Sequence, residues 1–469
     1  MSEKILLQEQ PAQKLDVKLI LKWATPIILA LLVYGLTAPL GESVRLFSTL
    51  TIWAVFSWVF EILPESLIAI MLVTFYILAG VAKPAQVFAP WLSNIPWIVF
   101  GGLILSMAMG KSGLAKRIAY KIIAVIGTSF IGILIGLGII GLVLTPLISS
   151  PSAKVLLLAP IIIGIFQALD IKPGSKAGTA LMLGIFYAVW SPSFLFITSS
   201  EGALAVQAVQ KVTGESLTFT GYMTHMSLIA VLWTFVSLVT LLLIKPGKLH
   251  VNRDTLDKNL KELGRITREE KSCALLFIIM LILFLTDKWH KTNPAWIIVL
   301  ISSLMFFPGI NVLKKEDLSK VNFLILFFVT GAMGIGEAAN ACGATKIFTE
   351  AVIPFLQDQS ASAVILATWL IALIANFLLT PVAIMGALFV PIVEIFNTLG
   401  LNPYIGPYSL ILGFSHLLFP YEMAPALVVY SFGYIKLNDM IKLGFIRMIV
   451  GVIFMLLIVI PYWKMINLM

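Results

Sequence analysis

Charged residues are scarce in this chain of 469 residues, where Asp, Glu, Lys and Arg together make up 12%. Soluble globular proteins carry about 25% charged residues, whereas hydrophobic residues here reach 59%. This composition excludes an ordinary soluble protein and predicts a polytopic helical membrane protein. Segments of about ten residues with strict polar–apolar alternation are missing from the sequence, which argues against a transmembrane β-barrel.

Cysteine and histidine are also rare. The two cysteines, Cys273 and Cys342, lie far apart and fit no metal-binding or redox spacing. A lone histidine inside a span, such as His225 or His416, is more often a packing residue than a proton relay. No catalytic constellation and no nucleotide-binding domain appear. We therefore expect that the protein is neither an enzyme nor a nucleotide-driven pump. We also expect no organic cofactor, and the sequence identifies no metal site with certainty.

Acidic residues are fewer than basic ones, which gives a formal net charge of +9. The basic side chains gather at the ends of apolar segments that face one side, which is the positive-inside pattern. The charge therefore indicates membrane orientation and not a nucleic-acid partner. We expect an integral protein of the cell (inner) membrane with a cytoplasmic N-terminus and a C-terminus that lies outside.

The N-terminal segment lacks the pattern of a cleavable signal, because no small-residue cleavage site follows a short apolar core. Lys14, Lys18 and Lys22 instead share one helical face, as in an interfacial helix that leads into the first span. We assign residues 1–45 to this interfacial helix and the first span.

Two polar stretches, each broken by a proline, interrupt the most apolar parts of the chain. The first, Leu147–Lys154, lies between apolar arms of about 12–16 residues, short of the roughly 20 that a spanning helix needs. The second, Leu378–Ala383, has a similar setting. Each predicts a re-entrant helical hairpin, at about 130–169 and about 361–400. Two such tips in corresponding halves point to the binding site of a transporter.

Landmarks of the first half recur in the second at one fixed interval. The matched pairs are Pro64 and Pro294, Gly101 and Gly331, Gly113 and Gly343, and Lys116 and Lys346. Several landmarks at one interval indicate an internal duplication. An odd number of spans in the first copy makes the second copy inverted. The predicted repeats are residues 46–244 and 272–469, joined by a cytoplasmic linker at 245–271, with about 11 transmembrane helices in all.

Three short motifs and this layout resemble the divalent anion/sodium symporter family. The motifs are Glu61-Ile62-Leu63-Pro64, Gly101-Gly102-Leu103 and Phe432-Gly433-Tyr434-Ile435-Lys436. The likeness extends over nearly the whole chain and implies a secondary active transporter of small organic or inorganic anions, such as di- and tricarboxylates, by symport or exchange. It also implies a homodimer and an elevator movement, in which the hairpins and broken helices carry substrate past a fixed scaffold.

The hairpin tips depart from the Ser-Asn-Thr signature of that family. They read Ser150-Pro151-Ser152 and Thr380-Pro381-Val382, so proline replaces both asparagines. Proline has no side-chain acceptor and no N–H, although backbone carbonyls can still bind a hard cation. Two alternatives therefore remain: the tips still form sodium sites, or the hairpins keep the fold of the family with altered binding. The tips supply the predicted substrate-binding residues Ser149, Ser150, Ser152, Lys154, Thr380 and Val382.

Lys154 follows the first tip, at the place where exchangers of the family carry an arginine. A cation there would suit a substrate carboxylate as a single point charge. The alternative is a lysine that pairs with a nearby glutamate or reaches water. The second tip has no counterpart, because Ile384 follows Ala383.

Each broken helix carries a glutamate at a matched position, Glu201 in the first and Glu422 in the second. A charge at the bilayer centre costs on the order of 3 kcal/mol or more, so it normally has a partner or a function. These carboxylates could pair with a cation, take up a proton or bind a cationic or zwitterionic substrate. Capping of the following half-helix is the structural alternative.

The predicted coupling and ion residues are Ser150, Thr198, Glu201, Thr380 and Glu422, with sodium near Ser150 and Thr380, or protons, as the coupling ions. The rival function is a proton- or cation-coupled carrier of a non-dicarboxylate substrate that uses Glu201 and Glu422. A channel is a weaker rival, because the polar residues form isolated tips and not a continuous path.

Overall fold

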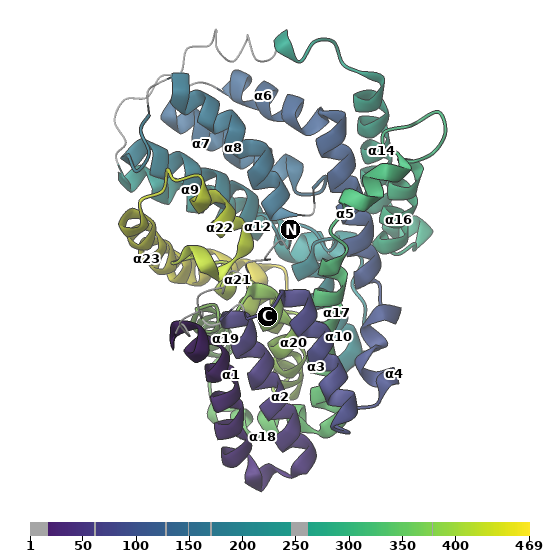
Figure 1. Cartoon of the computed structure of the whole chain (residues 1–469), viewed down its shortest axis with the longest axis vertical. Helices are drawn as coiled ribbons and strands as arrows, with labels where there is room; N and C mark the ends of the chain where they lie inside the picture. Colours follow the sequence, from purple (N-terminus) through teal and green to yellow (C-terminus); the bar gives the residue numbers. More distant parts are fainter. Residues whose placement is uncertain are drawn as a thin grey trace, which may run out of the picture.

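The computed structural model describes residues 17–60, 62–126, 129–148, 150–168, 171–244, 261–377 and 379–469. Every regular element in these ranges is a helix (Figure 1). The first half contains α1 (Val17–Leu36), η1 (Ala38–Leu40), α2 (Glu42–Val59), α3 (Glu65–Leu78), α4 (Pro84–Val87), η2 (Ala89–Leu92), α5 (Ile95–Ser112), α6 (Leu114–Ile126), α7 (Phe130–Leu144), α8 (Pro151–Ala168), α9 (Lys176–Trp190), α10 (Ser200–Thr213), α11 (Phe219–Tyr222), η3 (Met223–Ser227), α12 (Leu228–Thr240) and η4 (Leu241–Ile244).

The regular elements of the second half are also helices. It contains α14 (Arg268–Leu285), α15 (Asp287–His290), α16 (Pro294–Leu304), η5 (Lys315–Lys320), α17 (Leu324–Cys342), α18 (Ala344–Leu356), α19 (Ala361–Ala375), α20 (Pro381–Thr398), α21 (Ile405–Phe414), η6 (Pro420–Glu422), α22 (Ala424–Ser431), α23 (Leu437–Phe454), η7 (Met455–Val459) and α24 (Ile460–Met465).

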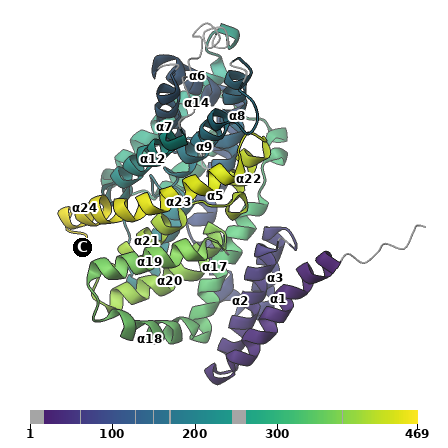
Figure 2. The ribbon, with the colours of Figure 1, turned by 90° about the vertical axis from the view of Figure 1, so that its left-hand side faces the viewer.

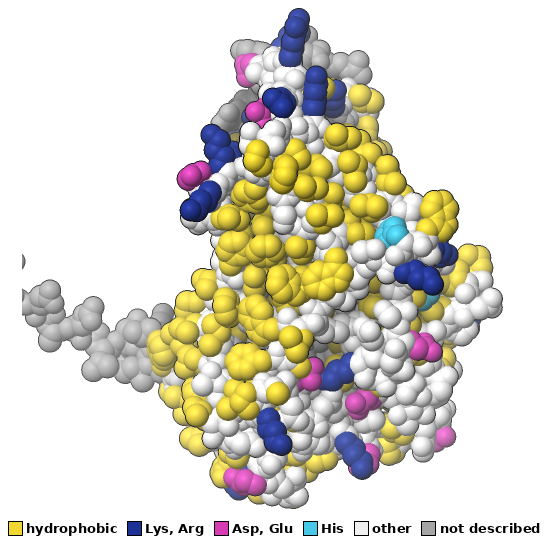
Figure 3. Space-filling view, turned by 90° about the vertical axis from the view of Figure 1, so that its right-hand side faces the viewer, with side chains coloured by type: hydrophobic (Ala, Val, Ile, Leu, Met, Phe, Trp, Pro, Cys, Tyr) yellow, Lys and Arg dark blue, Asp and Glu magenta, His cyan; other side chains and the backbone are white. Residues whose placement is uncertain are grey.

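Within the described ranges, five helical segments are long and apolar enough to cross a membrane. They are Ile95–Ser112, Phe219–Ile244, Leu324–Cys342, Pro381–Thr398 and Leu437–Met465. Apolar side chains cover the middle of the face in Figure 3, and Lys and Arg gather toward its upper end. The chain is therefore an integral membrane protein, with an apolar zone between polar ends.

Packing divides the helices into two groups. In the scaffold group, which comprises α1–α5 and α14–α17, α1 packs on α2, α3 on α17, and α5 on α16. In the hairpin group, which comprises α7–α12 and α19–α24, α7 packs on α9, α19 on α21, and α8 on α22. Contacts of α17 with α20 and of α5 with α10 join the groups. Figure 2 shows α1, α2 and α3 beside the hairpin group.

The two hairpin segments lie at opposite ends of the molecule. Helices α7 and α8 lie near the top of both Figures 1 and 2, whereas α19 and α20 lie in the lower half. Helices α6 and α18 precede the two hairpins and lie at the same opposite ends. The two hairpins therefore occupy opposite ends of the molecule.

Matched glycines turn the chain from the scaffold group into each hairpin. Gly113 ends α5 with φ +80°, and Gly343 ends α17 with φ +82°. Only glycine adopts this left-handed conformation without a steric penalty, and it commonly terminates helices for that reason. The sequence landmark therefore corresponds to the same backbone turn in both halves.

Both hairpin tips are shorter than the sequence predicted. The residues of Pro151–Lys154, predicted as part of a polar tip, form the first turn of α8, and α20 likewise begins at Pro381. Proline suits the first helical position, where its missing N–H would have no helical partner. Helices α8 and α20 therefore have 18 residues each, more than the expected arms of about 12–16.

Three other segments differ from the sequence-based expectation. Helix α1 runs unbroken from Val17, so no separate interfacial helix appears in the described residues, and Lys14 lies outside them. The first broken helix ends at Trp190, well before Thr198, because Pro192 has no N–H with which to continue the helical hydrogen bonds. Helix α14 begins at Arg268, inside the predicted linker, and residues 245–260 lie outside the described ranges.

Candidate functional site

The first hairpin tip places a lysine inside the protein. Ser150 precedes α8, and its Oγ accepts a hydrogen bond from the Ala153 N–H at 3.3 Å, as an N-cap does. Lys154, in the first turn, is only 1% exposed. Its Nζ donates to Thr145 Oγ1 at 3.1 Å, which leaves the ammonium with further donors to offer.

The break of the first broken helix places a glutamate beside the same tip. Ser199 caps α10 by accepting a hydrogen bond from the Gly202 N–H at 3.0 Å. Glu201 follows in the first turn and is 5% exposed. Ser200 Oγ donates to Glu201 Oε2 at 2.9 Å. The carboxylate therefore sits at the positive end of the α10 dipole, where an anion is favoured.

One enclosed cavity of about 30 Å³ lies between this tip, this break and the scaffold group. Its lining residues are Gly102, Leu105, Thr145, Pro146, Pro151, Lys154, Ser193, Phe196, Thr198, Ser199, Ser200, Glu201, Met280, Phe284 and Ile298. This volume is enough for about one water molecule. The cavity is thus too small for an organic anion until the two helix groups separate.

Charge in the cavity comes from both a cation and an anion. Lys154 and Glu201 line it together, and no ion pair joins them among the residues the structure describes. The N-termini of α8 and α10 add positive partial charge, because their first N–H groups lack helical partners. An anionic group entering the cavity would meet one ammonium and two helix N-termini, and would have to be kept apart from one carboxylate.

The second tip has different polar groups. Thr380 precedes α20, and its buried Oγ1 has no hydrogen-bond partner in the described part of the chain. Asn376, at the end of α19, donates from Nδ2 to the His416 carbonyl at 3.0 Å and to Glu422 Oε2 at 2.9 Å. The Asn376 Oδ1 is also buried without a partner among those residues. At this tip, two buried acceptor oxygens therefore lack partners among the residues that the structure describes.

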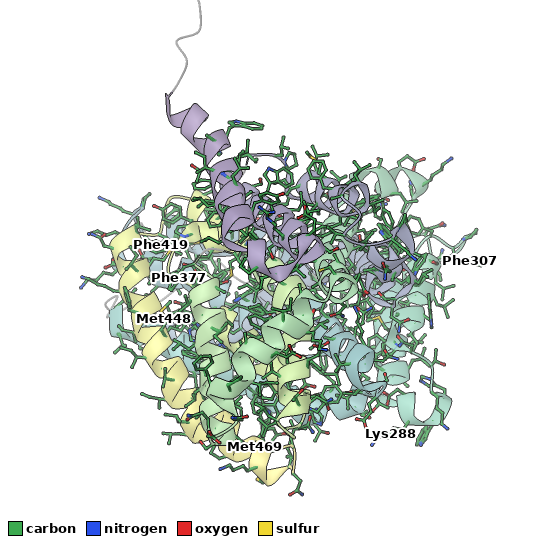
Figure 4. All side chains as sticks on the ribbon, turned by 90° about the horizontal axis from the view of Figure 1, so that it is seen from below. Lys288, Phe307, Phe377, Phe419, Met448 and Met469 are labelled. Carbon is green, nitrogen blue, oxygen red and sulfur yellow. The ribbon has the colours of Figure 1, made fainter. Side chains whose placement is uncertain are left out.

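Glu422 is held by the backbone of its own break. It is 2% exposed, and its Oε1 accepts hydrogen bonds from the N–H groups of Leu418 at 3.0 Å and Phe419 at 2.7 Å. Together with the bond from Asn376, these contacts give the carboxylate three donors. Figure 4 labels Phe419, one of these donors, and Phe377, which follows Asn376 in the chain. The carboxylate therefore binds the N–H groups at the start of η6 and not those at the start of the following helix, α22.

The other predicted residues divide between the two tips. Thr198 lines the enclosed cavity with Lys154 and Glu201, whereas Thr380, Val382 and Glu422 are not among its lining residues. Ser152 and Val382 are partly buried. Ser149 lies outside the described residues, as do Leu378 and Glu61 of the sequence motifs.

Arg447 is a buried charge that the sequence reading missed. It lies in α23 with no exposed surface, and it contacts both broken helices. A lone arginine inside the long apolar segment Leu437–Met465 was the available signal, since intramembrane charges are rare and usually functional. Asn376, in the apolar arm before the second tip, was also missed.

Both histidines considered above lie among aromatic rings. His225 Nδ1 is 3.2 Å from the Tyr408 hydroxyl. His416 is buried between Trp233 and Trp369, with ring centroids at 5.2 and 5.3 Å. Neither residue lines the enclosed cavity, which fits packing roles.

Comparison with known proteins assigns the family. The family model described as the sodium:sulfate symporter transmembrane region matches residues 14–469. The chain therefore belongs to this family of membrane transporters, as the motifs and tips suggested, and it is a transporter and not an enzyme.

Individual relatives are distant. The inner membrane protein YbhI of Escherichia coli is 25% identical over 335 residues, which cover 68% of this chain and 69% of the relative. The sodium-dependent dicarboxylate transporter SdcS of Staphylococcus saprophyticus is 23% identical over 447 residues, covering 87% and 84%. Among solved structures, the YdaH transporter of Alcanivorax borkumensis has a TM-score of 0.52 at 12% identity, covering 82% of this chain and 88% of that one, and shows a related fold.

Proposed function

We propose that this protein is a secondary active transporter of small organic or inorganic anions, with di- and tricarboxylates as the first candidates. The observation that carries the proposal is the enclosed cavity, where Lys154 and the N-termini of α8 and α10 meet. Helix N-termini and an ammonium favour a carboxylate without a cluster of basic residues. The name of the SdcS relative, a sodium-dependent dicarboxylate transporter, supports the same substrate class.

An elevator movement is the proposed mechanism. The cavity lies between the two helix groups and is too small for an organic anion, so substrate access requires the hairpin group to move against the scaffold group. A homodimer would hold the scaffold still during that movement. The basic end of Figure 3 is the proposed cytoplasmic side, with the N-terminus cytoplasmic, the C-terminus outside and about 11 spans.

Sodium is one proposed coupling ion, and the second tip is the better supported place for it. Thr380 Oγ1 and Asn376 Oδ1 are buried oxygens without partners in the described chain, and oxygen is the ligand that hard cations prefer. At the first tip, Ser150 Oγ already accepts the Ala153 N–H. We infer that Thr380 and Asn376 would hold the ion, while Ser150 mainly orders the start of α8.

The alternative is a proton- or cation-coupled carrier of a zwitterionic or cationic substrate. The presence of Glu201 in the cavity favours it, because a carboxylate there opposes a dianion and suits a proton or a cationic group. Glu422 lends it less support, since three hydrogen bonds already occupy its oxygens. Glu201→Gln should then remove the pH dependence of transport between pH 5 and pH 8, and Glu422→Gln should not. Identical profiles for Glu201→Gln and wild type would exclude the proton role.

Counterflow in proteoliposomes tests the main proposal. Labelled succinate is placed outside and unlabelled succinate inside, with sodium present or replaced by choline. Sodium-dependent uptake supports symport, and uptake in choline supports exchange or proton coupling. Lys154→Met should lower uptake roughly 10–100-fold in either condition, whereas Lys116→Met, at an exposed lysine on α6, should not. No uptake by folded wild-type protein, with citrate and sulfate also inactive, would reject the proposed substrate class.

A further inference from the structure

Arg447 carries a positive charge into the core of the hairpin group, and no acidic partner for it lies among the described residues. Its side chain is 0% exposed, and no described Asp or Glu forms an ion pair with it. A buried charge is strongly destabilising unless hydrogen bonds and nearby dipoles compensate it. The neighbours of the guanidinium therefore show what the charge is for.

Two of its hydrogen bonds reach the ends of the two broken helices. Nη2 donates to Ser191 Oγ at 3.1 Å, and Nη1 donates to the Ser415 carbonyl oxygen at 2.6 Å. Ser191 is the C-cap of α9, and Ser415 is the C-cap of α21. The last carbonyls of a helix lack helical partners and carry negative partial charge. One guanidinium thus bonds an end carbonyl of α21 and the C-cap hydroxyl of α9, at the C-terminal ends of both half-helices that lead into the breaks.

The remaining contacts fix the plane of the guanidinium. Nε donates to Ser237 Oγ on α12 at 3.0 Å. The carbon atom of the guanidinium lies 4.7 Å from the ring centroid of Tyr187 and 4.6 Å from that of Trp233. The edge of the group meets oxygens, and its faces meet rings. This geometry suits arginine, which offers a planar fork, better than lysine, which offers a point charge.

We propose that Arg447 is a positioning residue whose fixed charge joins the C-terminal ends of α9 and α21, so that the two breaks stay in register without a bound cation at that junction. Ser191 and Ser415 begin the two irregular segments that lead to Glu201 and Glu422. The inference goes beyond the proposed transport function and rests on it only for the transport measurement described below.

Thermal unfolding of purified protein tests whether the charge or only the volume matters. The variants are Arg447→Ala, which leaves a space, Arg447→Met, which fills much of it without charge, and Arg447→Lys, which keeps the charge. We expect both neutral variants to melt below wild type and Arg447→Lys to melt between them and wild type. Methylguanidinium at millimolar concentration should raise the melting temperature of Arg447→Ala, whereas the neutral isostere methylurea should not. Neither compound should help Arg447→Met.

Succinate counterflow separates positioning from substrate contact. Arg447 does not line the enclosed cavity, so Arg447→Met should lower Vmax at least tenfold while KM stays within about twofold, and methylguanidinium should restore Vmax to Arg447→Ala. Equal rescue by methylurea, or an Arg447→Met protein that melts and transports like wild type, would overturn the inference. If Arg447→Ala does not fold, the melting temperatures of Arg447→Lys and Arg447→Met are compared instead. An Arg447→Lys variant no more stable than Arg447→Met would overturn the inference. A wild type without counterflow would count against the proposed function only, since the unfolding measurements stand alone.

Discussion

The two broken helices present glutamates at matched positions, and the structure gives these carboxylates opposite surroundings. Glu201 receives a hydrogen bond from its neighbour Ser200 and faces the enclosed cavity with Lys154. Glu422 receives two backbone N–H groups and the Asn376 amide. A duplicated sequence pattern therefore has two different surroundings: Glu201 faces the cavity, and Glu422 is held by backbone N–H groups and Asn376.

The two hairpin tips also differ in the polar groups that they offer. The first tip offers a cation, Lys154, at the start of α8. The second offers acceptor oxygens, Thr380 Oγ1 and Asn376 Oδ1, that lack partners in the described chain. A site for an anion in the first half and a site for a cation in the second would let the two halves bind a substrate and its coupling ion side by side.

Removal of the charge at the first tip should have the largest effect. A hydrogen bond to a charged group contributes about 1.5–3 kcal/mol, so Lys154→Met should lower succinate transport by roughly 10–100-fold. Lys154→Arg should retain part of the activity. Initial rates of counterflow measure this, with Ile384→Met on the second tip as the matched control. A fully active Lys154→Met variant would remove the distinction between the tips.

Truncation of the two glutamates should separate stability from transport. Glu422→Ala removes the acceptor of the buried Leu418 N–H, at about 1–3 kcal/mol for such a group, and also breaks the hydrogen bond from the Phe419 N–H. Its melting temperature in detergent should fall clearly. Glu201→Ala, which breaks one bond from Ser200, should melt close to wild type and alter transport instead. The reverse pattern would show that the two roles had been exchanged.

Added volume should destabilise both halves of the protein equally where a hairpin helix packs closely on its broken helix. A Cβ added at Gly141 would collide with the Ala188 carbonyl oxygen, and one added at Gly413 would collide with the Trp369 carbonyl oxygen. Both contacts join a hairpin helix to its broken helix. Overpacking costs about 1–3 kcal/mol, so Gly141→Ala and Gly413→Ala should both melt early. Gly164→Ala, with no atom within 4 Å of the added Cβ, should melt at or above wild type.

The smallest expected effect lies in the scaffold group, outside the spans. The Lys111 ammonium lowers the pKa of Asp317 from its usual value of 3.8 to about 2, with help from the Lys314 N–H and Lys320. A depressed pKa stabilises the folded state above the usual value and loses that contribution as pH falls through the folded value. Melting temperatures measured from pH 5 to pH 2 should show this loss in wild type. Asp317→Asn should be less stable at pH 5 and should lack that part of the decline.

Much of the fold was predictable because its signals are local in sequence. Low charge content and long apolar segments predicted a helical membrane protein, and the family comparison agrees. The glycines Gly113 and Gly343 marked the same turn in both halves because a positive φ requires glycine. The length of the tips was wrong, because proline was read as a breaker where it starts a helix.

The site was less predictable, because it depends on contacts between distant segments. Lys154 and Glu201 were proposed from their positions, but their common cavity also needs walls from α5, α14 and α16. The partners of Arg447, Ser191 and Ser415, lie far from it in the chain. The periodicity of the sequence does not indicate such contacts, although an arginine in an apolar segment by itself suggests a functional residue.

The amino-acid sequence by itself determined the membrane class, the duplicated landmarks and the two polar tips, because hydrophobicity, glycine and proline act through the residues next to them. Only the tertiary structure decided which glutamate faces a cavity and which caps a backbone. The reason is physical: the two carboxylates share the same chemistry, and what distinguishes them is the donors that folding brings to each, one Ser200 hydroxyl to Glu201 and the Leu418, Phe419 and Asn376 N–H groups to Glu422.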